Sequence, residues 1–329
     1  MEAIVHKKYG PPDVLNLEEV ENPAPKDDEV LVKVHAASVN AADWHLLRAD
    51  PFLVRLMGMG LLRPKNKILG ADVAGRVEAV GANVTRVQPG DEVFGDVSGC
   101  GFGGFAEYVC ATEDALAPKP ANLSFEEAAA VPLAALTALQ GLRDKGQIQQ
   151  GQKVLINGAS GGVGTFAVQI AKSFGAEVTG VCSTSKLDLV RSIGADHVID
   201  YTQEDFTENG QHYGLILAAN GYHPISHYRR ALSQGGIYVM TGGSGAQMIQ
   251  AMAVGPMLSI TGSKKMGNLL MKSNAGDLLL VKELLEAGKV VPVIDRHYPL
   301  SEVPEAICYL EEGHARGKVV ITFEHDETR

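Results

Sequence analysis

Two patterns of hydrophobic and polar residues divide the chain. Up to about residue 120, short Val-rich runs separated by polar turns, such as residues 31–39 and 73–81, predict β-strands. After about residue 150, apolar runs of four to six residues are separated by segments with helical periodicity. Such alternation indicates crossover units and a parallel sheet, so the second region is predicted to be α/β.

The later elements can be placed one by one. Ser124, followed by Phe-Glu-Glu, is typical of a helix start, and Pro132 must kink or divide the Ala- and Leu-rich helix that follows. The expected strands are residues 153–157, 177–181, 197–201, 215–220, 236–240, 258–261 and 318–323, and the expected helices are residues 163–174, 185–193 and 275–287. We therefore expect a β-rich domain in two parts, residues 1–122 and 264–329. A doubly wound α/β domain, residues 123–263, is inserted between them.

Composition narrows the class of protein. The 329 residues are 45% hydrophobic, which is enough for full-sized cores, and 29 Lys+Arg against 39 Asp+Glu give a net charge of −10. The acidic balance argues against nucleic acid as the main partner. Residues 231–263 carry no charge, yet Gln, Ser, Gly and Pro interrupt them too often for a membrane-spanning helix. The four cysteines lack a C-x-x-C pattern, so a reducing, cytoplasmic setting is expected.

A glycine-rich turn follows the strand expected at 153–157. Gly158, Gly161 and Gly164 form G-x-x-G-x-x-G at the opening of a helix, where main-chain N–H groups can face a pyrophosphate. The alternative is an ordinary tight turn between a strand and a helix. We expect a dinucleotide at this turn, bound by Ser160, Gly161, Gly162 and Val163.

The end of the next strand indicates which dinucleotide is bound. NAD sites usually place Asp or Glu there, whereas this chain has hydroxyl groups and a cation from Ser183 to Lys186. Ser183 and Lys186 are suited to a 2′-phosphate, and Tyr201 at the end of the third strand adds a phenolic donor. These features favour NADP(H), although Ser183 can also cap the following helix.

Several segments together resemble the medium-chain dehydrogenase/reductase superfamily, and within it the zinc-independent quinone oxidoreductase branch. They are VNAADWHL from residue 39, LGADVAGRVEAVGANV from 69, QPGDEVFG from 88, NGASGGVG from 157 and GHARGKVVI from 313. The resemblance implies a Rossmann domain inserted in a β-rich GroES-like catalytic domain. It also implies a homodimer, since relatives often join sheet edges.

A metal is not expected. Where zinc-dependent members of the family carry Cys and His ligands, this chain has Asn40 and the segment Gly70-Ala71-Asp72. His223 and His227 share i, i+4 spacing, but two histidines alone are more typical of a solvated surface.

Without a Lewis acid, hydride transfer favours small-molecule electrophiles that are already electron-poor, such as quinones and α,β-unsaturated carbonyls. The resemblance implies that Asn40 reaches the nicotinamide or the substrate oxygen. In the same segment, Asp43 is expected to order that network or relay a proton, and Trp44 to line the pocket of a flat substrate. Cofactor contacts are expected from Asn40, Thr137, Asn220, Thr241, Gly242 and Lys318. The alternatives are a capping role for Asp43, a packing role for Trp44 and a surface salt bridge for Lys318. At the level of function, the alternatives are a zinc-free alcohol dehydrogenase or ketone reductase, and a non-catalytic NADPH-binding sensor or structural protein.

Overall fold

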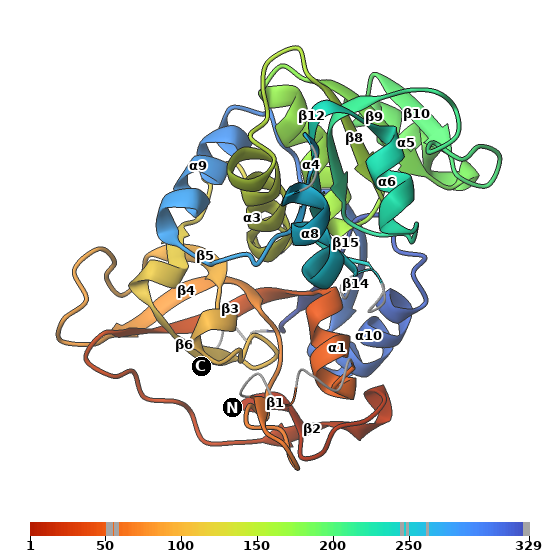
Figure 1. Ribbon diagram of the computed structural model, residues 1–329. Helices are drawn as coiled ribbons and strands as arrows, with labels where there is room; N and C mark the ends of the chain where they lie inside the picture. The colour runs from red at the N-terminus through yellow and green to blue at the C-terminus, as the bar shows by residue number, and fades with distance from the viewer. Residues whose placement is uncertain (51–54, 56–58, 244–246, 248–249, 261–262, 325–329) are drawn as a thin grey trace. The chain divides into compact units, whose positions relative to one another are not determined.

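The computed structural model describes residues 1–329 apart from residues 51–54, 56–58, 244–246, 248–249, 261–262 and 325–329 (Figure 1). The chain forms two compact units. Unit 1 comprises Met1–Leu133, Lys272–Glu286 and Pro292–Arg329, and unit 2 comprises Ala134–Met271 and Ala287–Val291. The domain limits expected from the sequence lie close to the limits of these two units. That one unit is the catalytic domain and the other the cofactor-binding domain remains a prediction.

Unit 1 is built on a seven-stranded sheet in the order β14-β15-β3-β4-β5-β7, with β6 also paired to β3. The strands of unit 1 are β1 (Glu2–His6), β2 (Leu15–Glu19), β3 (Glu29–Val39), β4 (Asp72–Val80), β5 (Glu92–Asp96), β6 (Tyr108–Thr112), β7 (Leu116–Pro118), β14 (Ile294–Pro299) and β15 (Lys318–Thr322). The helices are α1 (Ala41–Arg48), α2 (Phe125–Ala129), α9 (Ala275–Glu286) and α10 (Val303–Glu311). Buried valines along β3, β4 and β15 form much of the core.

Two sequence signals near residue 130 are confirmed. Ser124 precedes α2, where its hydroxyl accepts from the Glu127 N–H and the Glu127 carboxylate accepts from the Ser124 N–H. Pro132 divides the apolar segment, since α2 ends at Ala129 and α3 (Pro132–Gln140) begins at the proline. Helix α3 leads the chain from unit 1 into unit 2.

Unit 2 contains a six-stranded parallel sheet in the order β10-β9-β8-β11-β12-β13, the strand order of a dinucleotide-binding Rossmann fold. Its strands are β8 (Lys153–Asn157), β9 (Glu177–Cys182), β10 (His197–Asp200), β11 (Tyr213–Ala218), β12 (Leu232–Met240) and β13 (Lys265–Asn268). Its helices are α4 (Gly162–Ser173), α5 (Leu187–Ser192), α6 (Ile225–Ala231) and α8 (Gly255–Ile260). The apolar runs of β8 and β11 are central strands with largely buried residues, as their composition predicts.

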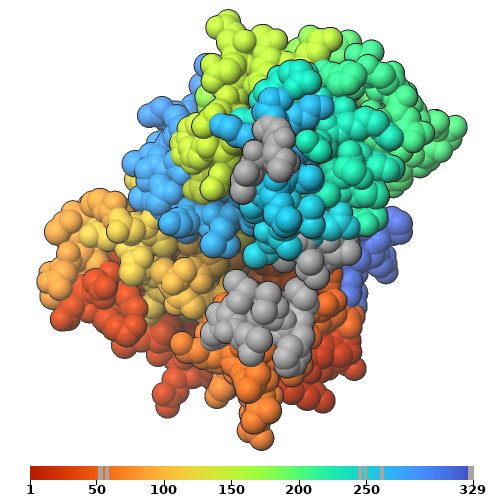
Figure 2. Space-filling model, viewed as in Figure 1, coloured from red at the N-terminus to blue at the C-terminus, as the bar shows by residue number. Residues whose placement is uncertain are grey.

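The strand expected at 258–261 is wrong for residues 258–260, and residue 261 lies outside the described residues. Residues up to Ile260 belong to helix α8, whose Ser259 hydroxyl donates to the Gly255 carbonyl one turn earlier, and the sixth strand is β13. An apolar run of four residues carries too few periods to separate strand from helix. Figure 2 shows the surface of the segments around α6 and α8, in teal and cyan. Met257 of α8 is 68% exposed.

Candidate active site and cofactor-binding turn

Three polar residues meet where strands of unit 1 begin and end. Asn40 follows β3, Asp72 opens β4 and Lys318 opens β15. Antiparallel pairing brings them together, because Ser38 is the partner of Asp72 and Val39 is the partner of Val319. All three side chains are buried, with exposed fractions of 6% for Asn40, 0% for Asp72 and 2% for Lys318. We call Asn40, Asp72 and Lys318 the polar triad.

The triad is held by short hydrogen bonds. The ammonium group of Lys318 donates to Asn40 Oδ1 at 2.6 Å and to Asp72 Oδ2 at 3.1 Å, while Asn40 Nδ2 donates to the same Asp72 oxygen at 2.9 Å. The Ser38 hydroxyl also donates to Asp72 Oδ2, and the Leu133 N–H donates to Asp72 Oδ1. The alternative of a surface salt bridge for Lys318 is therefore wrong. Its charge is neutralised by a buried carboxylate, and the amide of Asn40 is fixed with its oxygen toward the ammonium group.

Asp43 lies in the first turn of α1 and binds the backbone of two segments that lead into triad residues, at Asn40 and at Gly70. Its carboxylate accepts the Asn40 N–H at 2.7 Å and the Gly70 N–H at 3.1 Å. Burial raises the pKa of Asp43 to about 7, against the two N–H groups that lower it. The capping role weighed for Asp43 is thus present, and its buried carboxyl group can also bind a proton near neutral pH.

Asp96, like the charge-balancing role of Asp72, was not indicated by any pattern in the sequence. It ends β5 as the cross-strand partner of Asp72, and its side chain is fully buried. One carboxylate oxygen accepts the Ser98 N–H at 2.9 Å, while Oδ2 has no hydrogen-bond partner among the described residues. Burial, and then the charge of Asp72, raises the pKa of Asp96 to about 6. In the sequence, Asp96 is visible only as an acidic residue at the end of an expected strand, and acidic residues are common at strand ends.

Trp44 is half-buried on α1 and packs against the core of unit 1. Its indole ring stacks on the neighbouring His45 ring with centroids 3.5 Å apart. The ring of His45 is in turn held by the Asp50 carbonyl, 2.7 Å from Nδ1. These contacts agree with the packing role weighed for Trp44, while its contact with a substrate stays a prediction.

The glycine-rich turn of unit 2 needs glycine for steric reasons. Gly158 has a φ of +83°, and a Cβ atom there would lie 2.8 Å from Asn220. A Cβ on Gly164 would lie 2.0 Å from the Gly158 carbonyl oxygen, so the start of α4 can approach β8 only without a side chain. The N–H groups of the first turn of α4, including Gly162 and Val163, lack helical acceptors and suit an anion.

The residues expected at the adenosine end come together at the ends of β9 and β10. Ser183 and Lys186 bracket the short turn after β9, and the Tyr201 N–H donates to the Cys182 carbonyl. Asp200 lies beside them, which the sequence analysis did not consider, and its carboxylate is held by the hydroxyl groups of Thr184 and Thr202. Strand β9 therefore ends without a carboxylate, but the neighbouring strand β10 ends with the carboxylate of Asp200.

A second group of expected residues gathers where β8, β11 and β12 end. The Asn220 N–H donates to the Asn157 carbonyl, and the N–H groups of Thr241 and Gly242 both donate to the Ala218 carbonyl. Thr137 is buried on α3. The carboxyl ends of parallel strands form the usual crevice for a nucleotide, so this edge of the sheet fits the remainder of a dinucleotide.

Known proteins match this chain over almost all of its length. The family model for the alcohol dehydrogenase GroES-like domain matches residues 26–121, and that for the zinc-binding dehydrogenase matches residues 193–321. The 2-methylene-furan-3-one reductase of Solanum lycopersicum is 38% identical, over 98% of this chain and 79% of the relative. The chloroplastic NADPH-dependent alkenal/one oxidoreductase of Arabidopsis thaliana is 36% identical over the same shares of the two chains.

Two solved structures extend the comparison. The quinone oxidoreductase of Coxiella burnetii matches with a TM-score of 0.88 and 32% identity, over 98% of this chain and 99% of that chain. The Escherichia coli quinone oxidoreductase complexed with NADPH matches with a TM-score of 0.85 and 25% identity, over 98% and 100%. This chain belongs to the medium-chain dehydrogenase/reductase superfamily, in its quinone oxidoreductase-like branch. The fold expected from the sequence, a Rossmann sheet together with a β-rich GroES-like domain, is confirmed.

The residues of unit 1 do not fit the zinc that the name of one family model implies. Asn40 and Ala71 stand where Cys and His ligands are expected in zinc-dependent members, and neither is a usual zinc ligand. The Lys318 ammonium, 2.6 Å from Asn40 Oδ1, places a positive charge where a metal cation would be repelled.

Proposed function

We propose that this protein is an NADPH-dependent, zinc-independent oxidoreductase that transfers hydride to a quinone or to an α,β-unsaturated carbonyl compound. The observation that carries the proposal is the buried polar triad, in which a lysine and an amide stand at the place of a metal site. The relatives named for quinone, furanone and alkenal reduction support the same substrate classes.

NADP(H) is the cofactor, and unit 2 supplies the groups that hold it. The N–H groups from Ser160 to Val163 would hold the pyrophosphate, and Gly158 and Gly164 would allow its close approach. Ser183 and Lys186 would bind the 2′-phosphate through charge-assisted hydrogen bonds, with Tyr201 beside them. When bound, NADPH supplies the hydride, and the chain's task is to orient it and to stabilise charge.

Unit 1 supplies the electrostatic part of the reaction. Lys318 has three N–H donors, and the described contacts use two of them, on Asn40 and Asp72. The third is the donor that we assign to the oxygen on which negative charge develops. Because one ammonium N–H stabilises less charge than a metal ion, the acceptor must delocalise charge itself, as a quinone or an enone does.

Steady-state NADPH consumption with matched quinones, enones, simple ketones and saturated aldehydes tests this function. We expect consumption with at least one quinone or enone, and little with the saturated analogues. Consumption confined to ketones would favour a ketone reductase, and NADPH binding without any consumption would favour a sensor or structural protein.

We also infer a homodimer and a reducing, cytoplasmic setting. Strand β13 is the edge of the six-stranded sheet, where the Ser259 hydroxyl of α8 pairs with the backbone of Met266, and the same helix exposes Met257. The inference of a reducing compartment rests on the four cysteines, which are all free thiols. None of the helices in the described part of the chain is long and apolar enough to cross a membrane. Sedimentation with β13 variants, and fractionation of the source cells, test these two inferences.

A further inference from the structure

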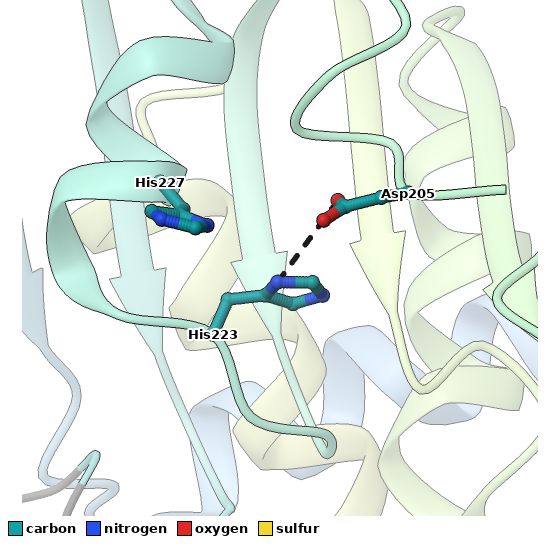
Figure 3. A group of neighbouring side chains, drawn as sticks. All are labelled: Asp205, His223 and His227. Carbon is teal, nitrogen blue, oxygen red and sulfur yellow. Dashed lines mark ion pairs between the residues drawn. The ribbon is translucent and has the colours of Figure 1, made fainter.

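Three potential metal ligands converge in unit 2, and none of them is a residue assigned above to cofactor or catalysis. Asp205 follows β10, His223 precedes α6, and His227 lies on α6. One ligand atom from each lies within 4.8 Å of the others, and this is the only such group of three among the described residues. Figure 3 shows the carboxylate and the two imidazole rings facing a common space.

The three side chains do not satisfy one another by direct hydrogen bonds. His223 Nδ1 lies 4.0 Å from Asp205 Oδ1, which is too long for a hydrogen bond. His227 Nδ1 is buried and has no hydrogen-bond partner among the described residues. A buried imidazole nitrogen without a partner carries a free-energy cost, which a bound cation would remove.

Neighbouring groups hold the candidate ligands in position. Asp205 Oδ1 accepts the Thr207 N–H at 2.8 Å, which orients the carboxylate. The His223 ring packs edge-on against Phe206 and Tyr228, with centroids 4.9 and 5.7 Å apart. Such support around the ligands is what metal sites require, because it fixes the direction of each lone pair.

We propose that Asp205, His223 and His227 bind a divalent transition-metal ion, with Zn²⁺ the best match. Two imidazoles and one carboxylate suit Zn²⁺, which takes three protein ligands and a water in open sites. With metal–ligand distances of about 2.0–2.1 Å, ligand atoms in a tetrahedral site are separated by roughly 3.3 Å. The side chains therefore need to close by only about 1–1.5 Å from their present 4.8 Å limit.

The ion would join two segments that are distant in the sequence. Asp205 belongs to the connection after β10, which also carries Tyr201, while both histidines belong to the β11–α6 region. Binding would thus tether the connection beside the 2′-phosphate site to α6. The sequence alone disfavoured a metal because it showed two histidines, and the third ligand comes from a separate loop.

Metal titration of the full-length, untagged protein tests the proposal. After chelation and removal of the chelator, Co²⁺ is used as a spectroscopic probe and Zn²⁺ as the competitor. We expect one Co²⁺ per chain, with d–d absorption that Zn²⁺ abolishes, and a higher thermal midpoint with Zn²⁺. Loss of an outer-shell partner alone costs about 10–100-fold in affinity, so His223→Gln or His227→Gln is expected to weaken binding by at least about 100-fold.

His197→Gln is the matched control, because exposed His197 also pairs with a carboxylate, Glu177, but has no third ligand nearby in the described structure. This variant is expected to bind the metal as the wild type does. Asp205→Asn, which keeps an oxygen for the Thr207 N–H, provides a second ligand variant if either histidine variant fails to fold. Absence of stoichiometric binding to the wild type, or equal binding by His227→Gln and His197→Gln, would overturn the proposal.

Discussion

The ammonium group of Lys318 lies 2.6 Å from the side-chain oxygen of Asn40, although 278 positions separate the two residues in the sequence. The link forms because β15 pairs with β3, so that Val319 lies opposite Val39. Asp72 accepts from both side chains and balances the charge of Lys318. The polar triad therefore depends on the sheet of unit 1 for its position and on its own hydrogen bonds for its orientation.

Breaking the ion pair of the triad should destabilise unit 1. Lys318→Met leaves the carboxylate of Asp72 buried without its cation, which costs about 3–5 kcal/mol. Adding Asp72→Asn removes that charge, so the double variant is expected to be less destabilised than the sum of the single variants. Urea unfolding of the four proteins measures the coupling.

Lys7→Met is the control for that cycle. Lys7 pairs with Glu18 at the same kind of distance, 2.8 Å, but its side chain is 69% exposed. Loss of such a surface pair is expected to change the stability by less than about 1 kcal/mol. Additive effects of Lys318→Met and Asp72→Asn would show that the two side chains are not coupled.

Asp96 predicts a pH dependence of stability. Burial, then the charge of Asp72, raises its pKa from 3.8 to about 6, so the folded protein binds this proton more tightly than the unfolded chain. That contribution to stability is present below pH 3.8 and is lost as the pH rises through about 6. Asp96→Asn should therefore gain stability relative to the wild type over this range, on the order of 2–3 kcal/mol.

The measurement for Asp96 is the difference in unfolding free energy between the variant and the wild type at a series of pH values. Asp188→Asn is the control, because the side chain of Asp188 is fully exposed. A difference between Asp96→Asn and the wild type that does not change with pH would contradict the assignment.

Gly164→Ala should abolish binding of both NADPH and NADH, because the new Cβ would meet the Gly158 carbonyl and displace the pyrophosphate turn. Gly267→Ala, on β13, is the control, since a Cβ there has no atom within 4 Å. Fluorescence titration with each cofactor measures the effect. Normal affinity in Gly164→Ala would show that the turn does not hold the cofactor.

Lys186→Ala should weaken the binding of NADPH more than the binding of NADH. A hydrogen bond to a charged group contributes about 1.5–3 kcal/mol, so the dissociation constant for NADPH is expected to rise about 10- to 100-fold. Lys153→Ala, at the opposite end of the same sheet, should leave both affinities unchanged. An equal loss for the two cofactors would remove Lys186 from the 2′-phosphate site.

Local patterns in the sequence were sufficient for much of the fold. The apolar strands, the turn from Gly158 to Gly164 and the helix start at Ser124 depend on neighbours in the chain, so they could be predicted. Asp96 and Asp205 could not, because their importance comes from partners on other strands or loops. Asp200 was missed for the same reason, since only sheet pairing brings it opposite Cys182.

The most direct measurement of the central claim is NADPH oxidation by chelator-treated protein with a quinone and an enone as acceptors. We predict turnover with at least one of them that survives metal removal, both in the wild type and in His227→Gln, which lacks the proposed ion site of unit 2. Lys318→Met should lose most of that turnover and keep measurable NADPH binding, because the expected contacts of unit 2 to the pyrophosphate and the 2′-phosphate remain. Absence of NADPH oxidation, or activity that disappears with the metal and returns with Zn²⁺, would contradict the account.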